Sequence, residues 1–375
     1  MTKIKVMTVF GTRPEGIKMA PIIKVMENIS EIDNTICITA QHREMLDQVL
    51  NLFHIEPDYD LNIFKPGQSL TEITMKALEG LEKVITEVKP HVLLVQGDTS
   101  TVFAGALAAF YQKIKIGHVE AGLRSGNLYS PYPEEANRKL TGTLTDFHFA
   151  PTETNRDNLL KEGYSDEKIF VTGNTVIDAL QYAVKKDYNF QIPLLNDLDY
   201  RDKKIILLTS HRRENIGKPM KNIFSAINQI ALKYDEVEVV FPIHLNPKVR
   251  EIANEIFQGN RRVHLIEPLD YEPFTNLMAK SYLVVTDSGG LQEEAPSLGK
   301  PVLVVREETE RPEGIEAGTA KLVGTDYDNI LKEMDILIFN QKEYDKMANA
   351  VNPYGDGRAS ERIADIILKH GVPKK

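Results

Sequence analysis

The chain has 375 residues, of which 42% are hydrophobic and 26% are charged. It is therefore too long for one ordinary domain and too apolar to be disordered, and we expect two domains of comparable size. The formal net charge of −9 argues against a nucleic-acid partner or an anionic membrane surface, although it allows a local cluster of cations around one phosphate-bearing ligand.

The single cysteine, Cys37, lies in an apolar run, which excludes a disulfide within the chain and a cysteine-based metal site. The apolar run at the N-terminus, Met1–Gly11, is too short for the core of a signal peptide, and no segment is long enough to span a bilayer. These features are typical of a cytoplasmic protein in a reducing compartment.

Short apolar runs alternate with helical patterns, which predicts parallel sheets. In the first half we expect strands at Val6–Phe10, Thr35–Ala40, Val92–Gln96, Ile114–Val119, Phe147–Ala150 and Ile169–Thr172. A second series predicts strands at Ile205–Thr209, Val237–Phe241, Val263–Ile266, Leu283–Thr286, Val302–Val305 and Lys321–Val323.

The two series predict an α/β fold of two Rossmann-like domains that face a central cleft. The polar segment Tyr188–Lys203 is interpreted as a surface connection near the boundary. We assign residues 1–185 to the first domain and residues 186–355 to the second. After the breaker-rich stretch Asn352–Gly357, an amphipathic helix at Ala359–Lys369 is expected to return to the first domain, so residues 356–375 are assigned there.

The turn after the first strand carries Arg13, and Lys18 follows five residues later. Both cations could reach the mouth of the cleft, where a guanidinium suits a pair of phosphoryl oxygens. Lone basic residues are more often solvated surface charges. Their position after the first strand favours a binding function.

Three acidic residues, Asp98, Glu120 and Glu134, lie at or just beyond the ends of strands in the first domain. Each alone is more simply a helix cap or a loop charge. Asp98 and Glu120 follow neighbouring parallel strands, where burial and mutual repulsion could raise one pKa and leave the other group ionised, as acid–base chemistry requires. His118 and Glu120 lack a third ligand at a standard spacing, so no metal site is predicted.

In the second domain, His211 and His244 each follow a strand, and His211 could donate to a phosphate or act as an acid. Ser288-Gly289-Gly290 then turns a strand into a helix. The glycines let backbone N–H groups approach an anion, which the helix dipole favours, so this turn predicts a phosphate site. Glu294 lies about 6 Å further along the axis at ~1.5 Å per residue, close to where a ribose would lie. An ordinary capped helix is the simpler alternative.

Read together, these runs resemble the non-hydrolysing UDP-N-acetylglucosamine 2-epimerase family, which has the glycosyltransferase-B type of fold. The resemblance covers essentially the whole chain. Its motifs are Phe10–Glu15 with Lys18, Thr39–Asp47, Gly97–Thr99, Gly117–Arg124, Ser130–Glu135, Thr172–Thr175, His211–Glu214, Ser288–Gly290 and Thr309–Glu313.

The resemblance implies reversible inversion at C2 of UDP-N-acetylglucosamine to give UDP-N-acetylmannosamine, without NAD or another cofactor, in the supply of cell-surface polysaccharide synthesis. Family members are thought to eliminate UDP to a 2-acetamidoglucal and to add it back. The implied catalytic residues are Asp98, Glu120, Glu134 and His211. The implied substrate-binding residues are Arg13, Lys18, Asp98, Glu120, His211, Leu269, Phe274, Ser288, Gly289, Gly290, Glu294 and Arg311, with Leu269 and Phe274 near the uracil and Glu294 on the ribose.

A homodimer and a second UDP-N-acetylglucosamine that acts as an allosteric activator are also implied. The activator residues would be Gln41, His42, Gln68, Glu134, Arg212 and His244. Some members have an arginine where this chain has Gly67, and Gln where it has Leu269. The lost arginine puts tight activation in doubt, though not catalysis.

Three other functions remain open. A retaining glycosyltransferase would share the fold and the phosphate site, but it would need an acceptor groove rather than three acids. A hydrolysing 2-epimerase would admit water and release free N-acetylmannosamine and UDP. A sensor of nucleotide sugars would have no use for the acids.

Overall fold

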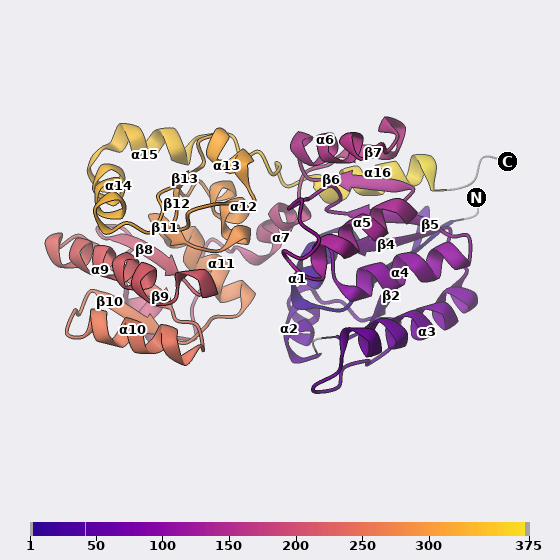
Figure 1. The fold of residues 1–375 in the computed structure, drawn as a ribbon, viewed down its shortest axis with the longest axis horizontal. Helices are drawn as coiled ribbons and strands as arrows, with labels where there is room; N and C mark the ends of the chain where they lie inside the picture. Colours follow the sequence, from indigo (N-terminus) through magenta and orange to yellow (C-terminus); the bar gives the residue numbers. More distant parts are fainter. Residues whose placement is uncertain (1–2, 42, 372–375) are drawn as a thin grey trace. The chain divides into compact units, whose positions relative to one another are not determined.

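The computed structural model describes residues 3–41 and 43–371, and the chain divides into two compact units. Unit 1 comprises the residues up to Tyr182 together with those from Tyr354 onward, and unit 2 is the continuous segment Ala183–Pro353. Figure 1 shows that each unit contains a sheet covered by helices. The predicted α/β class with two parallel sheets is confirmed.

Unit 1 has a seven-stranded parallel sheet in the order β3-β2-β1-β4-β5-β6-β7. Its strands are β1 (Ile4–Phe10), β2 (Ile32–Ile38), β3 (Tyr59–Asp60), β4 (Val92–Gln96), β5 (Lys115–Val119), β6 (Phe147–Ala150) and β7 (Ile169–Val171). The central strand β4 is buried at every residue, as expected for a parallel strand covered on both faces, and this explains its unbroken apolar run.

The helices of unit 1 follow its strands and return the chain to the start of the sheet. They are α1 (Arg13–Glu27), α2 (Arg43–Phe53), α3 (Leu70–Val88), α4 (Ser100–Tyr111), α5 (Glu134–Leu144), α6 (Glu153–Lys161), α7 (Thr175–Ala183) and α16 (Ala359–His370), with a 3₁₀ turn η1 (Asp166–Lys168). Successive strands are added on one side of β1 and then, from β4 onward, on its other side. The loops after β1 and β4 therefore diverge at the carboxyl edge, where open α/β sheets bind ligands.

Unit 2 repeats this plan with six parallel strands in the order β10-β9-β8-β11-β12-β13. They are β8 (Lys204–Thr209), β9 (Val237–Pro242), β10 (Val263–Ile266), β11 (Leu283–Thr286), β12 (Val302–Val304) and β13 (Ala320–Leu322). Its helices are α8 (Pro193–Asp197), α9 (Lys218–Lys233), α10 (Pro247–Phe257), α11 (Tyr271–Lys280), α12 (Gly289–Ser297), α13 (Pro312–Glu316), α14 (Tyr327–Phe339) and α15 (Gln341–Ala348), with a 3₁₀ turn η2 (Arg213–Asn215). The corresponding switch point lies between β8 and β11.

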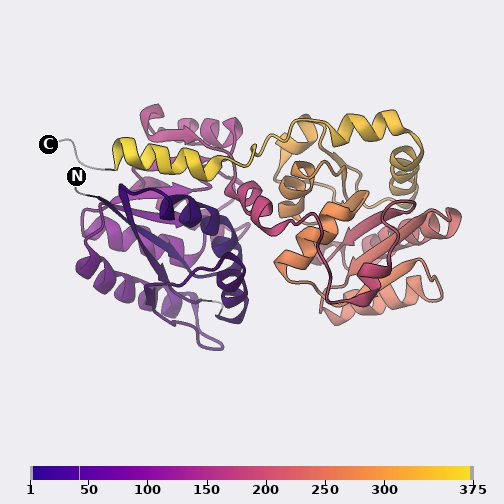
Figure 2. The same cartoon turned by 180° about the vertical axis from the view of Figure 1, so that it is seen from behind.

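The predicted return of the last helix to the first unit is confirmed. Figure 2 shows α16 in yellow beside the indigo N-terminal elements. Asp178 on α7 caps this helix by accepting the N–H groups of Ala359 at 3.3 Å and Ser360 at 2.7 Å. Ile363 and Ile367 on its inner face are fully buried.

Two local features differ from expectation. The strand expected to reach Ala40 ends at Ile38, because Ala40 has a φ of 52°, which a strand does not accommodate. The segment Tyr188–Lys203 is more than a surface connection: proline at the first helical position starts α8, and Phe190 and Leu195 are buried. None of the described helices has both the length and the apolar character that crossing a membrane requires.

Two buried histidines in unit 1 predict acid sensitivity. His118 on β5 and His148 on β6 are register partners, and both ring nitrogens of His148 lack a hydrogen-bond partner in the part of the chain that the structure describes. Burial lowers the pKa of His118 to about 4 and that of His148 to about 3. Because both values lie below the usual pKa of about 6.5, stability is fully present above pH 6.5 and is lost as the pH falls toward the folded-state values.

We expect each of these histidines to remove about 2 kcal/mol from the free energy of unfolding between pH 7 and pH 5. In His148→Leu, the loss over this interval should be smaller by that amount, measured by urea unfolding at each pH. His54→Asn, which changes an exposed histidine, serves as the control and should keep the wild-type slope. An unchanged slope in His148→Leu would contradict the prediction.

Candidate functional site

A buried carboxylate joins the two loops at the switch point of unit 1. Glu15 on α1 is 2% exposed. One of its oxygens accepts the N–H groups of Gly11 at 2.8 Å and Thr12 at 2.7 Å, and the other accepts the hydroxyl of Thr99 at 2.5 Å. Burial raises the pKa of Glu15, and these hydrogen bonds act against the rise. The loop before Arg13 is thus fixed to the loop that carries Asp98.

Asp98 lies directly after β4 and is held by α5. Its carboxylate accepts from Arg138 Nε at 2.9 Å and pairs with a terminal guanidinium nitrogen at 2.7 Å. Asn137 donates to the Asp98 carbonyl at 2.8 Å, and Arg138 also donates to the fully buried Glu135 at 3.1 Å. Both nitrogens approach the same carboxylate oxygen, Oδ2, so the ion pair anchors Asp98 through that oxygen.

Glu120, at the end of the neighbouring strand β5, has a different cation partner. Lys18 Nζ donates to its two oxygens at 2.7 and 2.6 Å, and Gln96 also donates to it. Glu120 has a φ of 66°, a left-handed conformation that is uncommon outside glycine. Each of the two acids therefore has its own cation partner.

Glu134 is the first residue of α5. Its Oε2 is buried and has no hydrogen-bond partner within residues 3–41 and 43–371. A buried acceptor without a donor costs roughly 1–3 kcal/mol. This oxygen is therefore the one among the three predicted acids that is poised to take a proton or a hydrogen bond from a ligand.

The predicted activator residues of unit 1 are held by neighbouring helices. Gln41 accepts from Thr101 on α4 at 3.1 Å, and Gln68 accepts from Lys76 on α3 at 3.3 Å. His42 lies outside the described residues. Gly67 has a φ of 73° with open space around it, so an arginine there would be strained by its backbone rather than by a clash.

In unit 2, Ser288 occupies the N-cap position of α12 as predicted, but its side chain makes no capping bond. Its own N–H donates to Thr286 Oγ1 at 2.9 Å. Because the serine hydroxyl does not occupy the first-turn N–H groups, they remain available to an anion, which the helix dipole favours.

Arg311 lies directly against this turn. A Cβ atom built on Gly289 would lie 2.6 Å from Arg311 Nη1 and 2.8 Å from Cζ, so a side chain at this position would force the guanidinium to shift. Arg311 Nε donates to Glu293 at 2.5 Å. The structure thus places a cation and a helix N-terminus side by side, as an anion site requires.

Glu294 extends back toward the start of α12, because its Oε1 lies 3.3 Å from where a Cβ on Gly290 would be. This is the direction in which helical side chains point. Tyr271 on α11 has a buried hydroxyl that lacks a hydrogen-bond partner among the described residues. Burial, and then the charge of Glu294, raise the pKa of Tyr271 well above its ordinary value. Leu269 precedes α11 and Phe274 lies on it, both half-buried.

His211 follows β8, and its ring stacks on that of His244 with centroids 5.4 Å apart and an interplanar angle of 17°. Arg212 lies 3.8 Å from Glu310, which also pairs with Arg306 at 2.7 Å. The catalytic candidate His211 and the activator candidates Arg212 and His244 are therefore neighbours.

Sequence reasoning gave no separate role to four residues that organise the site: Glu15, Arg138, Tyr271 and Asp287. The position of Asp287 in the sequence could have indicated its role, because an acid directly after an apolar strand at a switch point is expected to accept hydrogen bonds from loop N–H groups. The position of Arg138, one helical turn after Glu134, was a weaker indication. No sequence pattern near Tyr271 indicates a role for its hydroxyl.

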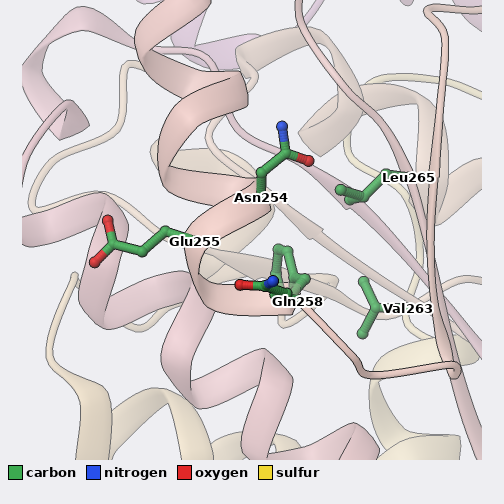
Figure 3. A pocket seen from close by; sticks show the side chains of 6 residues that line it. Asn254, Glu255, Gln258, Val263 and Leu265 are labelled. Carbon is green, nitrogen blue, oxygen red and sulfur yellow. The ribbon is translucent and has the colours of Figure 1, made fainter.

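A separate hollow of about 440 Å³ lies elsewhere on unit 2. Figure 3 shows the side chains that surround it, which come from the end of α10 and from β10: Asn254, Glu255, Phe257, Gln258, Val263 and Leu265. The end of α10 lies beside the start of β10, the amino edge of the sheet. The hollow is therefore remote from the loops at the carboxyl edge and contains none of the predicted site residues.

Known proteins resemble this chain over nearly its full length. A family model described as UDP-N-acetylglucosamine 2-epimerase matches residues 24–368. The enzyme of that name from Bacillus subtilis (strain 168) is 57% identical over 370 residues, covering 99% of this chain and 96% of that protein. The one from Escherichia coli (strain K12) is 53% identical over 378 residues, covering 98% and 100%. The crystal structure of UDP-GlcNAc 2-epimerase from Neisseria meningitidis bound to UDP-GlcNAc has 53% identity and a TM-score of 0.87, covering 98% and 100%.

The contact between Gly289 and Arg311 predicts opposite effects at two adjacent glycines. Alanine favours a helix over glycine by about 0.5–1 kcal/mol. Gly290→Ala should show part of this gain, because a Cβ there meets only the end of the Glu294 side chain at 3.3 Å. Gly289→Ala should not show this gain in stability, because the Arg311 guanidinium must shift and its ion pair with Glu293 is disturbed. Urea unfolding of both variants tests the difference, and equal stabilisation would refute it.

Proposed function

Because the chain belongs to the UDP-N-acetylglucosamine 2-epimerase family, we propose that it interconverts UDP-N-acetylglucosamine and UDP-N-acetylmannosamine by inversion at C2. The observation that carries the proposal is the set of three carboxylates at the carboxyl edge of unit 1, Asp98, Glu120 and Glu134, in a chain whose second unit has a helix N-terminus beside Arg311. A transferase or a sensor has no use for three acids placed in this way.

The C2 proton of the intact sugar is not acidic, so the proposed reaction begins with departure of UDP. The bond between C1 and the phosphate oxygen breaks, a carboxylate takes the C2 proton, and a 2-acetamidoglucal forms. A proton is then returned to the opposite face of C2, and the same UDP oxygen attacks C1 again. No water is consumed, which makes the enzyme non-hydrolysing.

Unit 2 is proposed to hold UDP throughout. The first-turn N–H groups of α12 and the Arg311 guanidinium offset the charge that develops on the departing diphosphate. His211 would contact the same phosphates, and Glu294 the ribose hydroxyls. Leu269 and Phe274 are proposed to surround the uracil.

Unit 1 is proposed to move the C2 proton. Asp98 is held by its ion pair with Arg138 and Glu120 by Lys18, while Glu134 Oε2 is a buried acceptor that a sugar hydroxyl or a proton would satisfy. Acids in such different surroundings suit different steps of one proton transfer sequence. Arg13 and Lys18 are proposed as further contacts of the substrate.

We further propose that the protein acts as a homodimer, that a second UDP-N-acetylglucosamine activates it, and that its product supplies cell-surface polysaccharide synthesis. The activator would contact Gln41, Gln68, Glu134, Arg212 and His244. The stacking of His244 on His211 supports a link between the two sets of residues.

Incubation with UDP-N-acetylglucosamine in D₂O, followed by NMR, separates the candidate reactions. We expect deuterium at C2 together with UDP-N-acetylmannosamine. Free N-acetylmannosamine would indicate a hydrolysing 2-epimerase, and an unchanged sugar would indicate a transferase or a sensor.

Asp98→Asn should slow C2 exchange by roughly 100-fold or more, the usual effect of losing a positioned acid–base group. Titration calorimetry should show unchanged UDP affinity, because the proposed UDP contacts lie in unit 2. Asp33→Asn, which alters an exposed aspartate on β2, is the matched control and should exchange normally. Normal exchange in Asp98→Asn would remove Asp98 from the mechanism.

A further inference from the structure

Asp287 is a fully buried carboxylate at the switch point of unit 2. It follows β11 and lies directly before the Ser288 turn. Its Oδ2 accepts four hydrogen bonds from the loop after β8: from Ser210 Oγ at 3.0 Å, His211 N at 2.9 Å, Arg212 N at 2.9 Å and Asn215 Nδ2 at 3.2 Å. These bonds fix the backbone on either side of His211.

The other oxygen of Asp287 is different. Oδ1 is buried and has no hydrogen-bond partner among the residues that the structure describes. His211 Nδ1 lies 3.4 Å away, in ion-pair range but without hydrogen-bond geometry. A buried carboxylate oxygen needs a donor, and a small rotation of the His211 ring would provide one.

We propose that Asp287 is a positioning residue for His211, which holds the imidazole with its proton on Nδ1 and leaves Nε2 to face the ligand. The proposal rests on the proposed function, in which His211 contacts the phosphates of UDP. When the ring carries both protons, its Nδ1–H group donates to the Asp287 carboxylate, and its Nε2–H group is available to a phosphate oxygen. A carboxylate at one ring nitrogen sets the role of the other in this way.

His244 restricts the same ring from its face. The two rings are nearly parallel, at 17°. His244 Nδ1 accepts the N–H of Asn246 at 3.1 Å, so its own proton is on Nε2. Burial, and then the neighbouring His211, lower the pKa of His244, while Asp287 acts against the change. His211 is thus held at its edge by Asp287 and on its face by a stacked ring, although its side chain is 43% exposed.

Asp287→Asn separates orientation of the ring from support of the loop. The asparagine carbonyl can still accept from the loop N–H groups, but its amide would present donors to His211 Nδ1. The ring must then accept at Nδ1 and carry its proton on Nε2, which reverses the tautomer.

The readout is long-range ¹H–¹⁵N NMR of the full chain labelled with ¹⁵N-histidine, recorded at about pH 8, above the ordinary pKa of an imidazole. The His211 signals are assigned by their loss in His211→Gln. We expect an Nδ1–H tautomer in the wild type and an Nε2–H tautomer in Asp287→Asn, with kcat for epimerisation lower by at least about 10-fold and KM changed less than threefold.

Asp178→Asn is the matched control, because Asp178 is also a buried aspartate that accepts two backbone N–H groups, but in unit 1. It should lower stability and leave both the His211 tautomer and kcat unchanged. The wild-type measurement does not depend on any variant folding: an Nε2–H tautomer for His211 there would overturn the proposal, as would wild-type kcat in Asp287→Asn. If the wild type shows the Nδ1–H tautomer but no C2 exchange, the pairing stands and the proposed function fails.

Discussion

A buried carboxylate that links the two loops at a switch point by hydrogen bonds is the constraint on which the candidate residues of each unit depend. Glu15 does this in unit 1, where it binds the loops after β1 and β4. Asp287 does it in unit 2: it lies in the loop after β11 and accepts hydrogen bonds from the loop after β8. Helices lead away from a switch point in opposite directions, so backbone N–H groups there have no partner in the sheet. Each acid accepts hydrogen bonds from such groups, and in doing so it fixes the loops that carry the candidate residues beside it.

The two units use this shared device for different chemistry. The edge of unit 1 carries carboxylates that are each matched to a cation, Asp98 to Arg138 and Glu120 to Lys18. The corresponding edge of unit 2 combines a helix N-terminus with Arg311 and a histidine. A repeated fold therefore places carboxylates paired with cations at the edge of one unit, and a helix N-terminus beside a cation at the edge of the other.

Most of the fold could be predicted from the sequence because buried parallel strands are unbroken apolar runs, and twelve of the strands lie where such runs occur. The exception, β3, spans only Tyr59–Asp60 and is too short to produce a pattern. The strand ends also identified the candidate residues, but not their partners. The pairing of Arg138 with Asp98 and the contact of Arg311 with Gly289 join residues far apart in the sequence. They depend on how helices pack and on which rotamers fit, and no local spacing encodes either.

The helix α16 affects how the protein is made. Unit 2 is one continuous segment, whereas unit 1 is completed by a helix that follows it in the chain. As the ribosome synthesises the protein, the second unit therefore has its full sequence before the first does. Until α16 emerges, the face of unit 1 that covers Ile363 and Ile367 stays open to water. Domains usually fold in the order in which they are synthesised, but here the N-terminal unit is the last to be finished, and it must avoid aggregation for the whole time that the second unit takes to be translated.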